Sequence, residues 1–114
     1  IEIDARLARF GAANLARAGV RNVKVELADG ARGWPARAPY DVIIVSGGLP
    51  ALPPGLLEQL KIGGRLAAIV GDAPVMTAQI VTRVTDSGYD TLKLFETSVK
   101  YLRNAWRPSR FRFE

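Results

Sequence analysis

Two uninterrupted apolar runs constrain the fold most strongly. Val42-Ile43-Ile44-Val45 is an unbroken β-branched stretch, and residues 66–70 form a second continuous apolar run. A strand that is apolar on both faces suits the middle of a parallel sheet that helices cover on each side. Between the two runs, Pro53-Pro54 opens a short helical stretch that carries three leucines, and Gly63-Gly64 is expected to stop it. The order of strand, helix and strand predicts a parallel β-α-β unit.

The N-terminal part of the chain shows the same alternation. Its first residues are expected to end a strand, and Asp4 is placed to cap a helix by accepting an N–H of the first turn. Gly19 is placed to end that helix in a left-handed conformation. Residues 23–28 predict a second strand, which Asp29-Gly30 closes. The helix has one apolar side, formed by Leu7, Phe10, Leu15 and Ala18.

The pattern changes after Pro74. Residues 78–85 and 89–99 predict two long antiparallel strands around the hairpin turn Asp86-Ser87-Gly88, where Gly88 can adopt a positive φ. The ordinary dinucleotide-binding fold continues with parallel strands instead. The sequence therefore predicts an α/β fold: a partial Rossmann-like sheet whose parallel strands end in a C-terminal antiparallel hairpin.

Composition excludes several classes of protein. The 114 residues, 48% apolar and 24% charged, are typical of one globular domain without repeats or an interior linker. The sequence contains no cysteine and no histidine, which excludes serine–histidine hydrolases, HExxH peptidases and zinc fingers within it, and we expect no metal site. No apolar run approaches the ~20 residues of a membrane-spanning helix. The start, Ile1-Glu2-Ile3-Asp4, does not resemble a signal peptide, so we expect a cytoplasmic protein without a membrane partner.

The charge is uneven along the chain. The net charge is +5, and most of the excess lies in the last fifteen residues, where Glu114 is the only acid. Such a tail is usually a solvated chain end, although it could also contact phosphate or an acidic peptide. A non-catalytic module that binds nucleic acid through this tail is therefore one alternative function. For the protein as a whole, we do not expect a nucleic-acid partner. The cations of the tail are Lys100, Arg103, Arg107, Arg110 and Arg112.

Two acidic positions fall at the predicted strand ends, beyond which ligands bind in a doubly wound sheet. Glu2 closes the first strand, where a carboxylate could accept both hydroxyls of an adenosine ribose. Asp29 could accept an adenine amino group, and Gly30 would allow a close approach. Two simpler interpretations stay open: Glu2 as a solvated acid near a helix N-terminus, and Asp29-Gly30 as an ordinary turn.

Small residues follow the central strand. Ser46-Gly47-Gly48 is expected to end it and to leave room for a reacting centre, or to form only a tight connection. No lysine motif precedes it, so a phosphate-binding loop is not expected. Trp34 and Trp106 could stack on a base, but packing is the better explanation for both.

Several blocks of sequence together resemble the protein-L-isoaspartate O-methyltransferase family. The similarity is strong from residue 1 to about residue 71 and weaker through the C-terminal hairpin. The individual blocks are not diagnostic, but their order and spacing are specific. The blocks are Asp29-Gly30, Gly33-Trp34-Pro35, Ala38-Pro39-Tyr40-Asp41-Val42-Ile43-Ile44-Val45 and Leu56-Leu57-Glu58-Gln59-Leu60-Lys61-Ile62-Gly63-Gly64-Arg65-Leu66.

The resemblance implies a class I methyltransferase that uses S-adenosyl-L-methionine (SAM). Its substrates would be isoaspartyl-containing proteins or peptides, whose carboxyl it methylates in protein repair. Glu2 matches the family's ribose-binding acid, and Ile3 would lie beside the adenosine. Asp29 and Gly30 match the pair that holds the adenine. Two further residues, Arg103 and Asn104, lie near another family segment that touches the cofactor.

Departures from the family's pattern limit what is expected of this chain. The family's glycine-rich cofactor loop and its serine-containing segment at the methyl-transfer centre would lie upstream of Ile1, so no catalytic residue is assigned. Residues 1–114 are therefore predicted to be the C-terminal part of a methyltransferase domain, inactive alone. An open sheet edge would then favour self-association.

The central strand carries the departure that bears on the substrate. Ser46-Gly47-Gly48-Leu49 replaces a typical Thr/Gly-Ala-Ala-Ala stretch, so Ser46 and Gly47 are candidates for the substrate cleft. A methyltransferase-like protein with a different substrate is an alternative on this ground. A nicotinamide-dependent dehydrogenase is a further one, against which the terminal hairpin counts.

Overall fold

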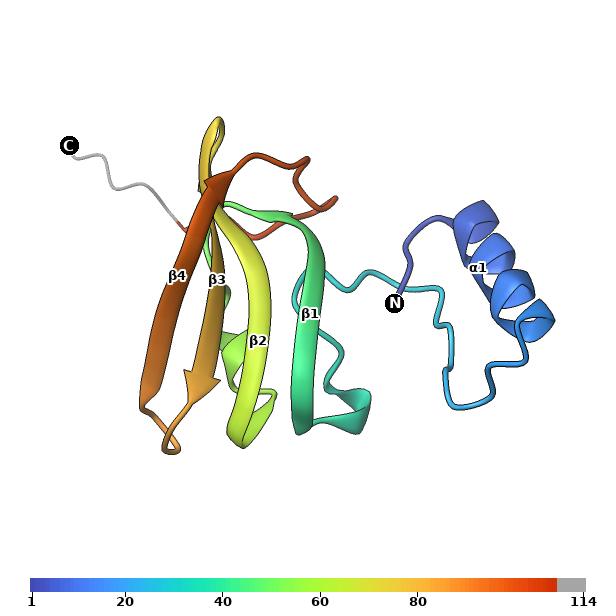
Figure 1. The fold of residues 1–114 in the computed structure, drawn as a ribbon, viewed down its shortest axis with the longest axis horizontal. Coiled ribbons are helices and arrows are strands. Elements are labelled where there is room, and N and C mark those ends of the chain that lie inside the picture. Colours follow the sequence, from blue (N-terminus) through green and yellow to red (C-terminus); the bar gives the residue numbers. More distant parts are fainter. Residues whose placement is uncertain (109–114) are drawn as a thin grey trace. The chain divides into compact units, whose positions relative to one another are not determined.

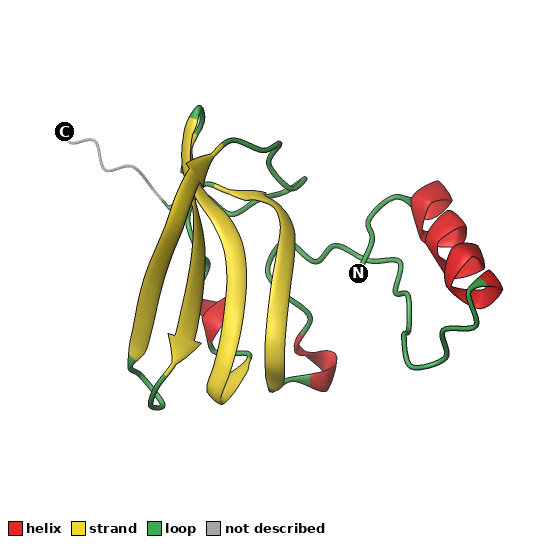
Figure 2. Cartoon of the chain, viewed as in Figure 1, coloured by secondary structure: helices red, strands yellow, loops and turns green. Residues whose placement is uncertain are grey.

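The computed structural model describes residues 1–108, which divide into two compact units. The first unit is Ile1–Gly30, and the second begins at Ala31. Figure 1 shows the helix and loop of the first unit and the sheet of the second, and Figure 2 separates helices, strands and loops by colour. Each unit is described separately below.

The first unit is built around α1 (Ala5–Arg17), whose predicted caps are confirmed. The Oδ1 of Asp4 accepts the N–H groups of Arg6 (2.8 Å) and Leu7 (3.1 Å), two donors that lack a partner inside the helix. At the other end, Gly19 has a φ of 75° and donates its N–H to Ala16 O. These bonds show that residues next to the helix in the sequence define both of its ends.

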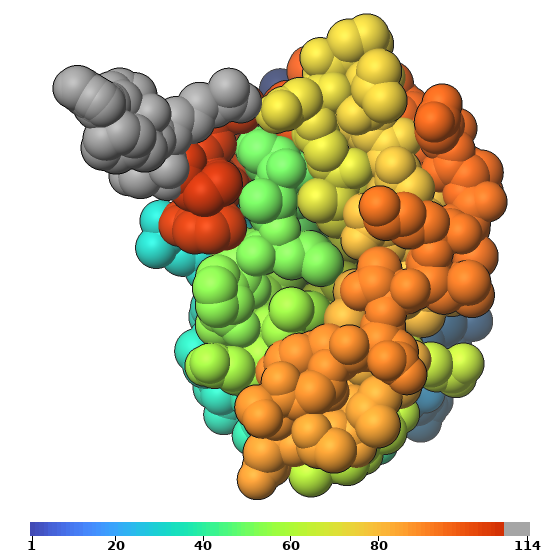
Figure 3. All heavy atoms as spheres, turned by 90° about the vertical axis from the view of Figure 1, so that its left-hand side faces the viewer, coloured from blue at the N-terminus to red at the C-terminus, as the bar shows by residue number. Residues whose placement is uncertain are grey.

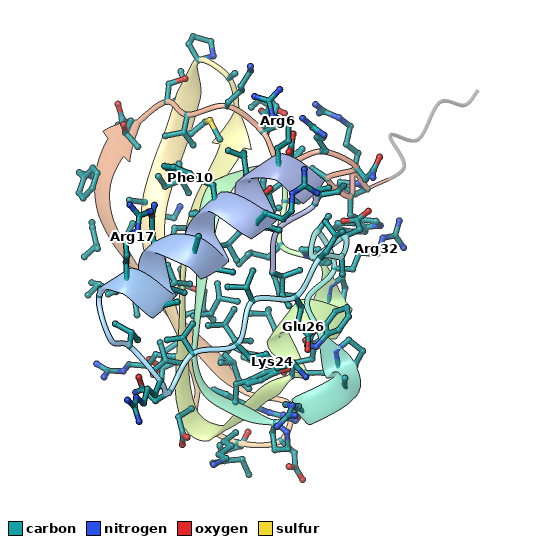
Figure 4. All side chains as sticks on the ribbon, turned by 90° about the vertical axis from the view of Figure 1, so that its right-hand side faces the viewer. Arg6, Phe10, Arg17, Lys24, Glu26 and Arg32 are labelled. Atoms are coloured by element: carbon teal, nitrogen blue, oxygen red, sulfur yellow. The ribbon has the colours of Figure 1, made fainter. Side chains whose placement is uncertain are left out.

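The predicted apolar side of α1 is not a buried side. Leu7 and Phe10 are 55% and 63% exposed, whereas the buried residue of α1 is Ala8. Figure 4 shows Phe10 on α1 between the labelled Arg6 and Arg17. The helix is therefore amphipathic in sequence, but its large apolar side chains remain accessible.

A single parallel bridge, Glu2–Leu27, replaces the second strand predicted over residues 23–28. Glu2 N–H donates to Glu26 O (2.9 Å), and Ala28 N–H donates to Glu2 O (3.0 Å). Asp4 caps α1 two residues after Glu2, so the chain turns into the helix directly after this bridge. The direction of the pairing is nevertheless parallel, as the alternating pattern predicted.

The second unit is a four-stranded mixed sheet in the order β1-β2-β3-β4. The strands are β1 (Tyr40–Leu49), β2 (Leu60–Asp72), β3 (Val75–Arg83) and β4 (Tyr89–Thr97), with the short helices η1 (Pro35–Arg37) and α2 (Pro54–Leu57) in the connections. β1 and β2 are parallel, and the β2–β3 and β3–β4 pairs are antiparallel. The predicted fold class is confirmed: parallel strands lead into a C-terminal antiparallel hairpin.

The prediction that Gly63-Gly64 ends the preceding helix is wrong: α2 ends at Leu57, and the glycine pair lies inside β2. Pairing with β1 starts at Leu60, opposite Tyr40, and the register then shifts before Val42. Gly63 has a φ of 86°, and a Cβ on Gly64 would lie 2.9 Å from Tyr40 O. The glycines therefore permit an irregularity within a continuous strand.

The predicted β3–β4 hairpin is present, and Figure 3 shows it at the surface of the molecule. Gly88 does not take the positive φ expected of it. It accepts Val84 N–H (2.8 Å) through its carbonyl, and a Cβ on it would lie 2.6 Å from Thr85 Oγ1. A close approach to the threonine hydroxyl, and not a left-handed backbone, accounts for glycine here.

The core of the second unit lies on one face of its sheet. Ile43 and Val45 of β1 pack against it, while Val42 and Ile44 on the other face are 55% and 74% exposed. The prediction that both faces of this strand are covered is therefore wrong for the described residues. Ten of the twelve residues of this core come from β1, α2, β2 and the loop between β1 and α2, and the other two follow β4. The buried cluster is Leu49, Leu56, Leu60, Leu66 and Ala68. The partly buried residues packed against it are Ile43, Val45, Leu52, Leu57, Val70, Leu102 and Ala105.

Candidate functional site

The first unit brings the predicted nucleoside-binding acids to one edge. The parallel bridge joins Glu2 to Leu27, and Asp29 follows Leu27 by two residues. Both carboxylates therefore lie at the carboxyl ends of two adjacent parallel stretches, which is where doubly wound folds bind ligands.

Glu2 has an oxygen that can accept from a ligand. Its Oε2 accepts the N–H of Asp4 at 3.1 Å, which orients the half-buried carboxylate toward the start of α1. Within residues 1–108, the Oε1 of Glu2 has no hydrogen-bond partner. A carboxylate oxygen of this kind suits a hydroxyl donor.

The Asp29-Gly30 turn packs closely on the start of the chain. A Cβ added to Gly30 would lie 3.0 Å from Ile1 Cγ2, so glycine allows the turn to approach Ile1. Asp29 is exposed, and Ile3 is half-buried. Gly30 thus has a packing role within its own unit, and Asp29 presents the polar group of the turn.

Ser46-Gly47-Gly48 does not end the central strand, contrary to the prediction, because β1 continues to Leu49. The register between β1 and β2 shifts between Ile44 and Gly48. Ser46 is exposed, but a Cβ on Gly47 would lie 2.4 Å from Leu102 Cδ2, and one on Gly48 would lie 2.6 Å from Met76 Cε. Packing therefore accounts for the two glycines, and Ser46 remains the accessible residue of the three.

Residues 99–105, called the strap below, cover this part of β1. Gly48 N–H donates to Lys100 O (2.8 Å), and Leu102 N–H donates to Gly48 O (3.0 Å). Figure 3 shows the strap, in red, beside the green segment that follows β1, in agreement with the packing of Leu102 and Ala105 on the core. Arg103 and Asn104 are exposed, and Asn104 has a φ of 60°.

Tyr101 is a residue of this region that the sequence did not single out. Its hydroxyl donates to Gly71 O (2.6 Å) and accepts Ala73 N–H (2.8 Å), and the Arg107 guanidinium lies 5.0 Å from the centre of its ring. The only available signal was an aromatic residue inside the basic tail. Of that tail, Arg110 and Arg112 lie outside the described residues.

A group of metal-binding side chains and a membrane-spanning helix are both absent from residues 1–108. Among residues 1–108, no group of three or more acidic side chains is placed to hold a metal ion. No helix in this part of the chain has the length and apolar character needed to cross a membrane.

Comparisons with known proteins give one consistent result. The family profile described as Protein-L-isoaspartate(D-aspartate) O-methyltransferase (PCMT) matches residues 1–103. The protein-L-isoaspartate O-methyltransferase of Pyrococcus abyssi is 56% identical over 71 residues, which are 62% of this chain and 33% of the relative. Protein-L-isoaspartate O-methyltransferase 1 of Rhodopseudomonas palustris (strain HaA2) is 46% identical over 93 residues, 82% of this chain and 37% of the relative.

Solved structures show the same fold. A protein-L-isoaspartate O-methyltransferase superposes with a TM-score of 0.77 at 27% identity, covering 88% of this chain and 32% of the other. A putative enzyme of this kind from Plasmodium falciparum, in complex with S-adenosyl-L-homocysteine, gives a TM-score of 0.74 at 18% identity over 89% of this chain and 50% of the other. The chain thus spans about a third of the length of the curated relatives it matches.

Proposed function

Because the chain belongs to the protein-L-isoaspartate(D-aspartate) O-methyltransferase family, we propose that it is part of an enzyme that transfers a methyl group from SAM to the carboxyl of L-isoaspartyl residues in damaged proteins. The Glu2–Leu27 bridge is the observation that supports this most directly. It gives Glu2 and Asp29 a common edge, as a nucleoside site requires.

The residues at this edge fit the adenosine part of the cofactor. The partnerless Oε1 of Glu2 would accept a ribose hydroxyl, and the exposed Asp29 would accept the adenine amino group. Gly30, which lacks a Cβ, would let the base approach the backbone. The bound cofactor would supply an electrophilic methyl group on a sulfonium sulfur.

The proposed reaction makes modest demands on acid–base chemistry. A peptide carboxyl is ionised at neutral pH, so it can attack the methyl group without a general base. A sequence without histidine or cysteine is compatible with such a reaction. Positioning the carboxylate and excluding water would provide the rate enhancement, and positioning can lower such a barrier by roughly 7–11 kcal/mol.

Binding of S-adenosyl-L-homocysteine to the 114-residue chain tests the nucleoside site. We expect Glu2→Gln and Asp29→Asn each to weaken binding roughly tenfold or more, because each removes a charged acceptor. Isothermal titration calorimetry gives the Kd, and amide chemical shifts locate the ligand.

Glu26→Gln is the matched control. Glu26 lies beside the same bridge, but its carboxylate pairs with Lys24 at 3.2 Å, as the labelled side chains in Figure 4 allow the reader to follow. We expect this variant to bind as the unmodified chain does. Equal affinities for all four proteins would refute the assignment of Glu2 and Asp29.

Methyl transfer tests the substrate. We propose that the 114 residues alone transfer methyl groups far more slowly than the full-length relatives, which are about three times as long as the aligned part. The assay compares an isoaspartyl peptide with its aspartyl isomer. Transfer to the aspartyl peptide at an equal rate would instead support a methyltransferase with a different substrate.

A further inference from the structure

The strap is tied to the sheet at two levels, by backbone and by side chain. Its backbone pairs with Gly48 near the carboxyl end of β1 through the two hydrogen bonds on either side of Tyr101. The Tyr101 hydroxyl then reaches the end of β2, where it bonds to Gly71 O inside the strand and to the N–H of Ala73, the first residue after it. One residue thus joins the strap to the carboxyl ends of both parallel strands.

The Tyr101 hydroxyl uses its donor and one acceptor position, and both partners are backbone groups. Phenylalanine at this position would keep the ring over which Arg107 lies, at 5.0 Å, and would remove only these two bonds. The two hydrogen bonds of the hydroxyl therefore fix the position of the strap, and the Tyr101→Phe substitution can remove them without changing the packing of the ring.

The strap also presents positive charge at this edge. Residues 97–108 contain three cations and no acid, namely Lys100, Arg103 and Arg107. Lys100 is exposed, and so is Ser46 at the neighbouring end of β1. Ligands of parallel α/β sheets bind beyond the carboxyl ends of the strands, so the edge that the strap covers is where the fold predicts a ligand. A positively charged edge favours the binding of an anionic ligand.

We propose that Tyr101 is a positioning residue, which fixes the strap as a wall that binds the carboxylate-bearing acceptor peptide. This inference rests on the proposed function, since the isoaspartyl carboxylate is the anion to be bound. Tyr101 does not touch the peptide; it acts by holding the exposed turn at Arg103 and Asn104 in place.

Peptide binding by the Tyr101→Phe variant tests the proposal. The full 114-residue chain is titrated with an isoaspartyl peptide and, separately, with S-adenosyl-L-homocysteine, and amide chemical shifts are recorded. We expect the Kd for the peptide to rise roughly tenfold, the effect of about one hydrogen bond on an equilibrium, while the Kd for S-adenosyl-L-homocysteine changes less than twofold. In the unmodified chain, the peptide should shift the amide signals of Arg103 and Asn104.

Tyr89→Phe is the matched control, because the Tyr89 ring lies under Arg83 (5.9 Å) in the β3–β4 hairpin and not in the strap. A merely structural role for Tyr101 would lower both affinities together, or neither, and either result overturns the proposal. A chain that binds S-adenosyl-L-homocysteine but no peptide also overturns it and leaves the nucleoside site standing. A chain that binds neither ligand contradicts the proposed function itself.

A charge variant keeps the test independent of Tyr101's effect on folding. Lys100→Glu reverses an exposed charge on the strap, and Lys93→Glu makes the same change on exposed β4. We expect only Lys100→Glu to weaken peptide binding, by roughly fivefold to tenfold at low salt, with the difference shrinking as salt rises. Equal peptide affinities for the two variants would contradict the proposal that the positive charge of the strap binds the peptide.

Discussion

Gln59 shows how one buried side chain can define a loop far from it in the sequence. It is 9% exposed, its Oε1 accepts Trp34 N–H (2.8 Å), and its Nε2 donates to Arg32 O (3.1 Å). Gly33 lies between these two backbone groups with a φ of 88°, and a Cβ there would lie 2.3 Å from Gln59 Oε1. The amide therefore holds both sides of a turn that only glycine can complete.

Replacing Gln59 tests this role. Gln59→Leu would leave Trp34 N–H and Arg32 O without their partners in a part-buried environment, and a fully buried group left unsatisfied costs about 1–3 kcal/mol. We expect the free energy of unfolding to fall by about 2 kcal/mol or more in urea titrations followed by Trp34 fluorescence, with Trp106→Phe as the background. Gln59→Glu keeps the acceptor for Trp34 N–H, so its free energy of unfolding should lie between those of the parent chain and of Gln59→Leu. A Gln59→Leu chain as stable as its parent would contradict the role.

Sequence reasoning succeeded for residues whose partners are close along the chain. Asp4 and Gly19 cap α1 through bonds that span two or three residues, so the local sequence pattern was enough to predict them. The Trp34–Gln59 and Tyr101–Gly71 bonds span 25 and 30 residues, and nothing local to either residue indicates them. The close packing of Gly47 against Leu102 could not be predicted for the same reason, because Leu102 is remote in sequence.

At the scale of elements, β1 and the strap depend on each other through Gly47. Because a Cβ on Gly47 would lie 2.4 Å from Leu102 Cδ2, Gly47→Ala must displace the leucine or the strand. We expect this substitution to lower the free energy of unfolding by about 1–3 kcal/mol, the usual cost of overpacking. Chemical denaturation checks the value.

Two further variants give this prediction its controls. Gly55→Ala adds the same methyl group in α2, where a Cβ meets nothing within 4 Å, and should have little effect. Combining Gly47→Ala with Leu102→Ala should recover part of the loss, as coupled neighbours do in a double-mutant cycle. If Gly47→Ala and Gly55→Ala were equally stable, the close contact would not be important to the fold.

Element boundaries were less predictable than element types. The pattern correctly gave strand, helix, strand and hairpin in order, because apolar periodicity reports the type of each element. It placed the start of β2 at Leu66, six residues late, because Gly63-Gly64 resembles a helix stop. Pairing with Tyr40 overrides that local signal, since the ladder bonds offset the weak strand preference of glycine.

At the scale of the whole molecule, the second unit has an apolar surface that a monomer rarely leaves uncovered. Ile44, Ala67, Ile80 and Leu92 are paired in register across the four strands and so point to one face, where Ile44 is 74% and Leu92 59% exposed. β1 is also an edge strand, with Val42 and Ile44 exposed. The outer edge of β1 pairs with the strap at Gly48. Contiguous apolar surface and a strand edge that is open before Gly48 both favour association between copies.

We therefore expect the 114-residue chain to self-associate as its concentration rises, and more so in high salt, which screens the repulsion between chains of net charge +5. Ile44→Lys should shift the equilibrium toward monomer, because it puts a charge in the exposed row. Thr91→Lys adds the same charge at an exposed residue of β4 that pairs with Val81, on the other face, and should shift it less. Light scattering and sedimentation measure the masses. A monomer at every concentration and salt would show that this face does not bind a second copy, and equal shifts for the two lysine variants would attribute the association to net charge instead of to the apolar row.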